Sequence, residues 1–125
     1  MRDFSEKVFT IIRKIPKGKV LTYGQVATLA GVPRASRIVG GLLFQQGLEK
    51  RLPWQRVINA QGKLSTYRVG MGTEQKRLLQ AEGIRFNRGG VIDLKQYQWW
   101  PSAKQMHHWE VSEETAFRIS ERLGF

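Results

Sequence analysis

Cysteine is absent from the 125 residues of this chain, and histidine is nearly absent. Without cysteine the chain has no disulfide, no thiolate metal ligand and no thiol nucleophile. Its only two histidines, His107 and His108, lack the ligand spacing of a zinc site, so we expect no metal and no cofactor. Long apolar runs are also missing, since no stretch reaches the roughly 18 residues of a membrane span. We therefore expect a soluble, intracellular protein with no membrane partner.

Acidic residues are few for a chain of this size. Ten Asp and Glu stand against 21 Lys and Arg, which gives a formal net charge of +11. Such an excess attracts polyanions, and nucleic acid is the first partner to consider. From Pro101 onward, however, three basic residues stand against four acidic ones, so this end is not expected to contact DNA. We predict a DNA-binding domain over residues 1–100 and a helical C-terminal extension over residues 101–125.

Two short helices with a tight turn between them are the clearest structural signal. Apolar residues recur at helical spacing over residues 24–30 and again over residues 34–46, and Gly31-Val32-Pro33 separates the two runs. This pattern is typical of a helix-turn-helix motif, in which the second helix recognises DNA. We expect the inward face of the second helix to contain Ile38, Val39, Leu42 and Leu43.

A basic hairpin is predicted after a further helix. Residues 73–82 have helical spacing and end at Gly83, whereas the apolar residues beyond them alternate around Asn87-Arg88-Gly89-Gly90. Between residues 48 and 67 the chain has no helical period, and Val57-Ile58 is expected to form a short strand within a loop. The fold class is therefore mainly α with small β elements, a winged helix-turn-helix.

Helices are also expected at both ends of the chain. Asp3 or Ser5 caps the first one, which ends at Pro16. Ser112 caps the last one, which packs either on the body or on another chain. Its apolar residues are Ala116, Phe117, Ile119 and Leu123.

Three segments carry a recognisable pattern. Residues 18–27 read Gly-Lys-Val-Leu-Thr-Tyr-Gly-Gln-Val-Ala, residues 34–40 read Arg-Ala-Ser-Arg-Ile-Val-Gly, and residues 53–58 read Pro-Trp-Gln-Arg-Val-Ile. In order and spacing they resemble the DNA-binding and active-site domain of the O6-alkylguanine-DNA alkyltransferases, the methylated-DNA-protein-cysteine methyltransferase family. In those enzymes the third segment reads Pro-Cys-His-Arg-Val, and its cysteine takes the alkyl group from guanine. Trp54 stands in the cysteine's place, which is typical of the alkyltransferase-like proteins.

This resemblance covers about residues 4–100 and implies the winged helix-turn-helix of the alkyltransferase C-terminal type. It also implies non-enzymatic recognition of O6-alkylguanine in double-stranded DNA. A small domain must turn the modified nucleotide out of the base stack to inspect it. The implied partners are DNA that contains the lesion and nucleotide excision repair proteins. We expect a monomer, in the cytoplasm at the nucleoid of a bacterium or in the nucleus of a eukaryote.

Nucleotide flipping is assigned by the resemblance to two residues. Tyr23 would crowd the target phosphate, and Arg37 would enter the duplex as a finger that fills the vacated space. On the residues alone, a tyrosine after a strand is more often a packing residue, and an arginine on a recognition helix more often contacts phosphate. Further DNA contacts are expected from Thr22, Gln25, Arg34 and Ser36.

Trp54 would form an apolar wall of the base pocket, although an isolated tryptophan is more often a core residue. Pro53 and Gln55 flank it, and either Tyr67 or Arg68 would face the flipped base, with Tyr67 preferred. Gln55 replaces the histidine that activates the cysteine in the enzymes and cannot serve as a general base. Arg56 and Glu82, the latter matching a glutamate of the enzymes, are expected to support the loop.

Two other functions fit parts of the sequence. A winged-helix transcription regulator would use Arg34 and Arg37 to read base edges in the major groove, but the loop around Trp54 has no role in such a protein. A glycosylase would use Glu82 on a flipped base, but nothing else in the chain supports that activity.

Overall fold

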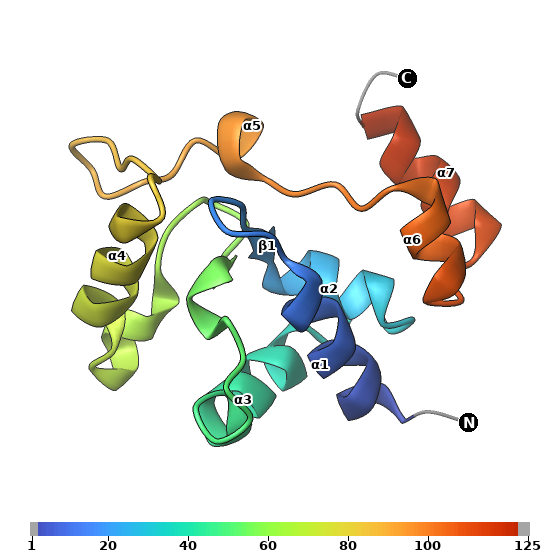
Figure 1. The fold of residues 1–125 in the computed structure, drawn as a ribbon, viewed down its shortest axis with the longest axis horizontal. Helices are drawn as coiled ribbons and strands as arrows, with labels where there is room; N and C mark the ends of the chain where they lie inside the picture. Colours follow the sequence, from blue (N-terminus) through green and yellow to red (C-terminus); the bar gives the residue numbers. More distant parts are fainter. Residues whose placement is uncertain (1–2, 123–125) are drawn as a thin grey trace.

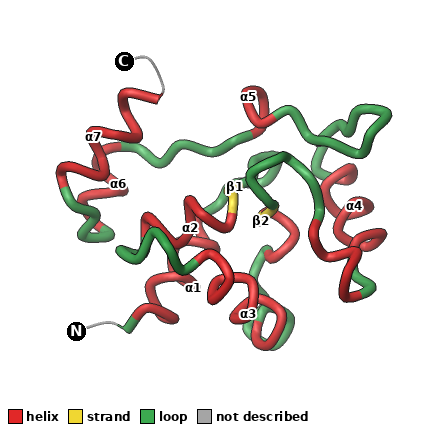
Figure 2. Tube along the Cα trace, turned by 180° about the vertical axis from the view of Figure 1, so that it is seen from behind, coloured by secondary structure: helices red, strands yellow, loops and turns green. Residues whose placement is uncertain are grey.

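A computed structural model of the chain describes residues 3–122 and the side chains as far as residue 119. The elements follow one another as α1 (Phe4–Lys14), β1 (Leu21–Thr22), α2 (Tyr23–Leu29), α3 (Ser36–Gln46), the 3-10 helix η1 (Trp54–Arg56), β2 (Val57–Ile58), the 3-10 helix η2 (Ser65–Val69), α4 (Gly72–Ala81), α5 (Leu94–Tyr97), α6 (Ala103–His108) and α7 (Glu113–Arg122). In Figures 1 and 2, α4 lies at one end of the molecule, α6 and α7 lie at the other, and α1 and α2 lie between them. No helix of residues 3–122 is long and apolar enough to cross a lipid bilayer.

The predicted helix-turn-helix is present as α2 and α3. The turn between them contains Gly31 with a φ of 97°, a backbone conformation that glycine adopts readily. The amide of Val32 then donates to the carbonyl of Ala27 (3.0 Å), which closes the turn against α2. Pro33 and Arg34 belong to this turn, so α3 begins at Ser36, two residues after its predicted start.

The inward face of α3 differs from the prediction. Val39 is buried, and Leu42 and Leu43 are half-buried, but Ile38 is 57% exposed. The prediction was wrong for Ile38 because the stripe that packs on α2 runs from Ala35 through Val39, at a spacing of four residues, and Ile38 lies about 100° around the helix from Val39.

A small sheet joins segments that are far apart in the sequence. β1 and β2 are parallel, with Leu21 opposite Val57 and Thr22 opposite Ile58. Val20, just before β1, also forms an isolated parallel bridge with Gln98. Its amide donates to the carbonyl of Tyr97 (2.9 Å), and its carbonyl accepts from the amide of Trp99 (2.7 Å). The start of α2 and the loop after η1 are therefore held beside each other.

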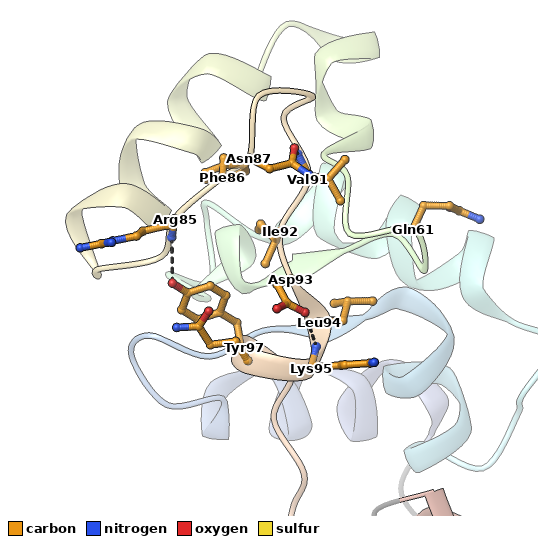
Figure 3. Close-up of a pocket in the computed structure, with 11 residues that line it drawn as sticks. Gln61, Arg85, Phe86, Asn87, Val91, Ile92, Asp93, Leu94, Lys95 and Tyr97 are labelled. Atoms are coloured by element: carbon orange, nitrogen blue, oxygen red, sulfur yellow. Dashed lines mark hydrogen bonds between the residues drawn. The ribbon is translucent and has the colours of Figure 1, made fainter.

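The predicted hairpin has very little strand. Phe86 and Ile92 form a single antiparallel bridge, and the amide of Asn87 donates to the carbonyl of Val91 (2.9 Å). The side chain of Asn87 accepts from two amides of the turn, and this satisfies the backbone locally. An open hollow of about 670 Å³ lies between this turn and α5 (Figure 3), where the hydroxyl of Tyr97 accepts from the amide of Arg85 (3.2 Å).

The C-terminal extension joins the main core. Met106 and Trp109 are buried in the same apolar cluster as α1 and α2, and the ring of Trp109 meets that of Trp99 edge-on at 5.9 Å. The predicted final helix is present as α7, and Ser112 caps it by accepting from the amide of Thr115 (3.2 Å). Ala116 and Ile119 pack on the core. Phe117, in contrast, is 63% exposed and does not pack on the body, whereas Leu123 lies outside the described residues.

Trp109→Ala is expected to lower the free energy of unfolding by about 3–5 kcal/mol, because it leaves a large cavity in the shared core. Urea unfolding monitored by circular dichroism measures this loss. Phe117→Ala is the matched control, since it removes an exposed aromatic ring from the same extension and should change the free energy by less than about 0.5 kcal/mol. Equal and small losses for the two variants would mean that the extension contributes little to the fold.

Candidate nucleic-acid interface

Trp54 lies on a short, well-ordered turn between α3 and β2. The amide of Trp54 donates to the carbonyl of Leu52 (2.8 Å), and the amide of Arg56 donates to the carbonyl of Pro53 (3.0 Å). Trp54 is half-buried rather than part of the apolar core. A Cβ atom on Gly47 would meet the Cβ of Trp54 at 3.4 Å, so the C-terminal end of α3 lies directly against this tryptophan.

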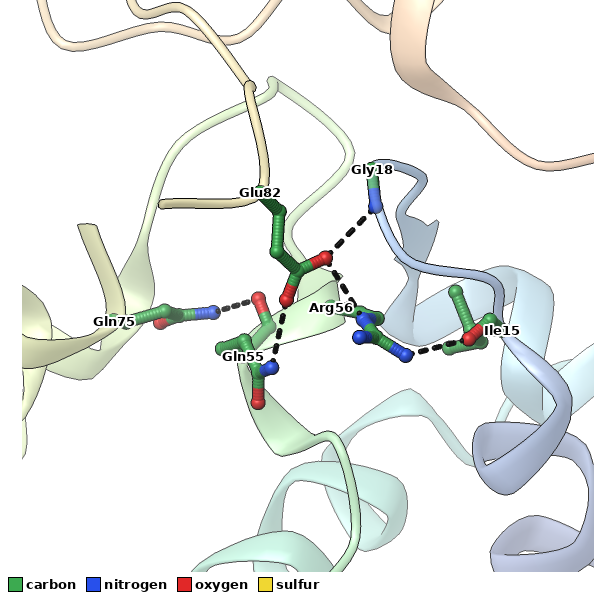
Figure 4. A network of polar contacts seen from close by, with 6 residues as sticks. All are labelled: Ile15, Gly18, Gln55, Arg56, Gln75 and Glu82. Carbon is green, nitrogen blue, oxygen red and sulfur yellow. Dashed lines mark hydrogen bonds and ion pairs between the residues drawn. The ribbon is translucent and has the colours of Figure 1, made fainter. Parts of the chain in front are cut away.

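A single carboxylate fixes the turn that carries Trp54 (Figure 4). Glu82, which follows α4, accepts hydrogen bonds from the amide of Gly18 (2.8 Å), Nε of Arg56 (2.9 Å) and Nε2 of Gln55 (2.9 Å). Arg56 also donates through Nη1 to the carbonyl of Ile15 (2.8 Å). Glu82 and Arg56 therefore tie the Trp54 turn both to α4 and to the segment after α1.

The surroundings of Glu82 keep it ionised. Its side chain is only 8% exposed, and this burial raises the pKa of its carboxyl. The hydrogen bonds from Gly18, Gln55 and Arg56, together with the charge of Arg56, lower that pKa by more, so the net shift is downward. Gln55 is the donor in this contact, and its amide cannot serve as a general base.

Gln75 forms a second polar link, from inside α4. Its side chain is fully buried, and its Nε2 donates to the carbonyls of Gln55 (2.9 Å) and Val57 (3.0 Å). Its Oε1 accepts from the hydroxyl of Thr66 in η2. A buried amide with all these partners holds η1 and η2 against the same helix. Sequence reasoning missed both Gln75 and Thr66, and the only available signal was that Gln75 shares the inward face of α4 with Leu79.

Tyr23 connects the recognition unit to η2. Its ring lies against Gly40 of α3, where a Cβ atom would approach Cε1 at 3.8 Å. Its hydroxyl accepts from the hydroxyl of Ser65 (3.3 Å), the first residue of η2. α2, α3 and η2 therefore meet at this half-buried tyrosine, and Ser65 is a further residue that the sequence did not reveal.

Arg37 lies in the first turn of α3 and is exposed. No hydrogen bond or ion pair among the described residues engages its side chain, so the guanidinium extends freely from the surface. Arg34, in the preceding turn, is exposed as well, and Ser36 is half-buried. These residues present positive charge and donors on one side of the helix-turn-helix.

Thr22 and Gln25 have a structural role that the sequence analysis did not assign. Thr22 is buried, and its hydroxyl accepts from the amide of Gln25 (3.1 Å) in a capping box that begins α2. Oε1 of Gln25 accepts in return from the amide of Thr22 (3.0 Å) and also from Gln98 (2.7 Å). Contact of either side chain with DNA stays a prediction; the Nε2 group of Gln25 makes no hydrogen bond within the described residues.

Tyr67 is exposed, as is its neighbour Arg68. The Tyr67 ring covers the backbone of Gly72 so closely that a Cβ atom there would overlap with it, at 2.2 Å from Cγ. Glycine at position 72 therefore sets where this ring lies. The ring of Tyr67 packs on Gly72, although the residue is 56% exposed.

The DNA-binding domain of the 6-O-methylguanine DNA methyltransferase family matches residues 3–84. The chain belongs to this family. It is 45% identical over 101 residues to the DNA base-flipping protein of Vibrio parahaemolyticus, which covers 81% of this chain and all of the relative. It is also 35% identical over 106 residues to alkyltransferase-like protein 1 of Schizosaccharomyces pombe, which covers 81% of this chain and 98% of that protein.

The fold is that of the alkyltransferase-like proteins. The crystal structure of S. pombe Atl1 in complex with damaged DNA containing O6-carboxymethylguanine superimposes with a TM-score of 0.72 at 36% identity, over 81% of this chain and all of that one. The predicted fold class and family resemblance are thereby confirmed.

The ionised state of Glu82 predicts a pH-dependent stability. Because its pKa in the folded state lies below the ordinary value, its contacts stabilise the fold above that ordinary value, and this stabilisation is lost as the pH falls through the folded-state pKa. Glu82→Gln should lower the free energy of unfolding at neutral pH by about 1–3 kcal/mol, and the difference from wild type should vanish in acid. Urea unfolding over a pH series measures both effects.

The matched control is Glu74→Gln, which removes an equal charge from an exposed pair with Arg77 on the same helix. Exposed pairs contribute little, so this variant should unfold almost as the wild type does at every pH. A Glu82→Gln deficit that persists unchanged into acid would contradict the assigned role of the carboxylate.

Proposed function

We propose that this chain recognises O6-alkylguanine in double-stranded DNA by turning the nucleotide out of the stack, and that it transfers no alkyl group. The observation that carries the proposal is the position of Trp54. It stands on the turn fixed by Glu82, directly against the end of α3, in a family whose enzymes carry the reacting cysteine at this place of the motif. The similarity to a protein crystallised with damaged DNA supports it.

Flipping requires force on the nucleotide and a replacement for it in the duplex. Unstacking costs a few kcal/mol, which contacts to the extruded state must offset. Tyr23 packs against Gly40 and its hydroxyl accepts from Ser65, and these contacts limit the positions that its ring can take beside a phosphate. The side chain of Arg37 makes no hydrogen bond or ion pair with the described residues, and it can both stack and hydrogen-bond in the vacated space, which lysine does less well.

The extruded base would meet an apolar surface and no nucleophile. The indole of Trp54 offers dispersion and hydrophobic contact to an alkyl group, and the ring of Tyr67 is positioned by Gly72 to take part in stacking. The chain has no cysteine, and the side-chain amide of Gln55 donates a hydrogen bond to Glu82. A proton relay of the kind that activates a thiol is therefore absent from this arrangement.

Recognition without repair needs a second protein to remove the lesion. We propose that the monomeric complex with DNA is handed to nucleotide excision repair proteins, at the bacterial nucleoid or in a eukaryotic nucleus. A flipped lesion beneath a bound protein distorts the duplex, and such distortion is the kind of signal that a general repair system can read.

Binding without reaction is the direct test. The wild-type protein should bind a duplex with one O6-methylguanine more tightly than the matched guanine duplex, and mass spectrometry should find both partners unchanged afterwards. Trp54→Ala should weaken lesion binding by about 1–3 kcal/mol, the value of one base–aromatic contact, and barely affect the undamaged duplex. Trp54→Phe is the matched control and should retain most of the preference.

Two results would contradict the proposed function. A methyl group gained by the wild-type protein would make it an enzyme. Equal affinity of the wild type for both duplexes would favour a general DNA-binding regulator instead.

Arg37→Ala should reduce the preference for lesion DNA, because the side chain stabilises only the flipped state. Arg34→Ala is the matched control, since it removes the same exposed side chain three residues earlier and should weaken both duplexes equally. Fluorescence anisotropy with the two duplexes at one salt concentration measures the preference. If Arg37→Ala also weakens both duplexes equally, Arg37 is an ordinary phosphate contact.

A further inference from the structure

α3 has an exposed face of which the proposed function uses only the first turn. Residues four, seven and eleven positions apart lie on one face of an α-helix. From Arg37 this face continues through Gly41, Phe44 and Leu48, and all four residues are exposed. Leu48 lies just beyond α3, where Gly47 still has helical backbone angles (φ −60°, ψ −44°).

Phe44 and Leu48 are the most exposed large hydrophobic residues of the described chain, at 69% and 70%. Neither belongs to the two apolar clusters of the core, so the fold does not require a phenylalanine at position 44. Isolated exposed apolar residues are common on protein surfaces. Two of them in line with Arg37 on a recognition helix form a continuous apolar strip on the face that meets DNA.

The spacing along α3 locates this strip on the duplex. Phe44 is seven residues from Arg37, which at 1.5 Å per residue is about 10 Å along the helix axis. With 3.4 Å per base pair, this distance spans at most about three base pairs along the duplex axis, the value for a helix parallel to that axis. α3 carries no acidic residue to repel phosphates over this distance. The net charge of +11 and the exposed Arg37 on the same face favour DNA as the partner of this strip.

We propose that Phe44, with Leu48 behind it, is an apolar anchor that contacts the duplex within about three base pairs of the flipped nucleotide. The inference rests on the proposed function, because it takes Arg37 as the residue that enters the duplex. A phenyl ring contacts sugar and base edges by dispersion and desolvation, and proteins that deform DNA commonly use such apolar side chains. Arg37 would contact DNA from the N-terminal end of α3, and Phe44 would contact it from the C-terminal end.

The test measures affinity for O6-methylguanine and guanine duplexes over a series of salt concentrations. Phe44→Ala should weaken both duplexes about tenfold. The slope of log affinity against log salt should stay that of the wild type, since an apolar contact releases no counterion. Phe44→Lys should bind with a slope steeper by about one phosphate contact. Phe44→Tyr should restore most of the affinity.

Phe117→Ala is the matched control, since α7 lies away from α3 in both views of the molecule (Figures 1 and 2) and the residue is similarly exposed. It should bind both duplexes as the wild type does. The proposal would be overturned if Phe44→Ala bound both duplexes with wild-type affinity. It would also be overturned if the affinity of Phe44→Ala fell together with a flatter slope of log affinity against log salt. If the wild type prefers the lesion duplex and Phe44→Ala binds each duplex as tightly as the wild type does, the role proposed for Phe44 is wrong and the proposed function still stands.

Shortened duplexes test the position of the contact. When base pairs are removed progressively on one side of the lesion, the difference between wild type and Phe44→Ala should disappear once the pairs within about three of the lesion are gone on that side. Removal on the other side should leave the difference unchanged. A difference that is insensitive to both truncations would overturn the assigned position.

Discussion

The hydrogen-bonded carboxylate of Glu82 is the contact on which the geometry of the site depends. It accepts from Gly18, Gln55 and Arg56, which lie 64, 27 and 26 residues away in the sequence. Loss of the carboxylate would leave the guanidinium of Arg56 and a backbone amide without their partner, which is costly for part-buried groups. The turn that carries Trp54 therefore depends on a residue outside the predicted set of DNA contacts. Gln75 reinforces it by holding η1 and η2 against α4.

Two kinds of interaction with DNA are separated in this molecule. The net charge of +11 gives affinity for any duplex, and this affinity falls as salt rises. In the proposed function, discrimination depends on short-range contacts of Trp54, Tyr67 and Arg37, which would be much less sensitive to salt because they involve stacking and shape. In the proposed function, few substitutions convert the reactive site of the family's enzymes into a receptor for the alkylated base. An indole replaces the thiol, and Gln55 keeps its hydrogen bond to Glu82 while giving up acid–base chemistry.

Local signals in the sequence predicted the helix-turn-helix, the caps at Asp3 and Ser112 and the short strand at Val57–Ile58, because each depends on neighbouring residues. The motif around Trp54 predicted the family for the same reason. The contacts of Gln75 and Ser65 were not predictable, since their partners lie 9 to 42 residues away and come together only in the folded chain. The exposure of Ile38 and the single bridge of the hairpin depend on packing angles, which periodicity does not encode. The shared core of α1 and the extension likewise follows from tertiary packing.

The most direct measurement is a crystal structure of the wild-type protein bound to a duplex with one O6-methylguanine. We expect the modified nucleotide outside the stack, its base against the indole of Trp54 and the methyl group still on the base oxygen. We also expect Arg37 within the duplex opposite the orphaned cytosine. A complex in which the methylated guanine remains stacked and paired, with α3 on an undistorted duplex, would contradict lesion recognition by flipping.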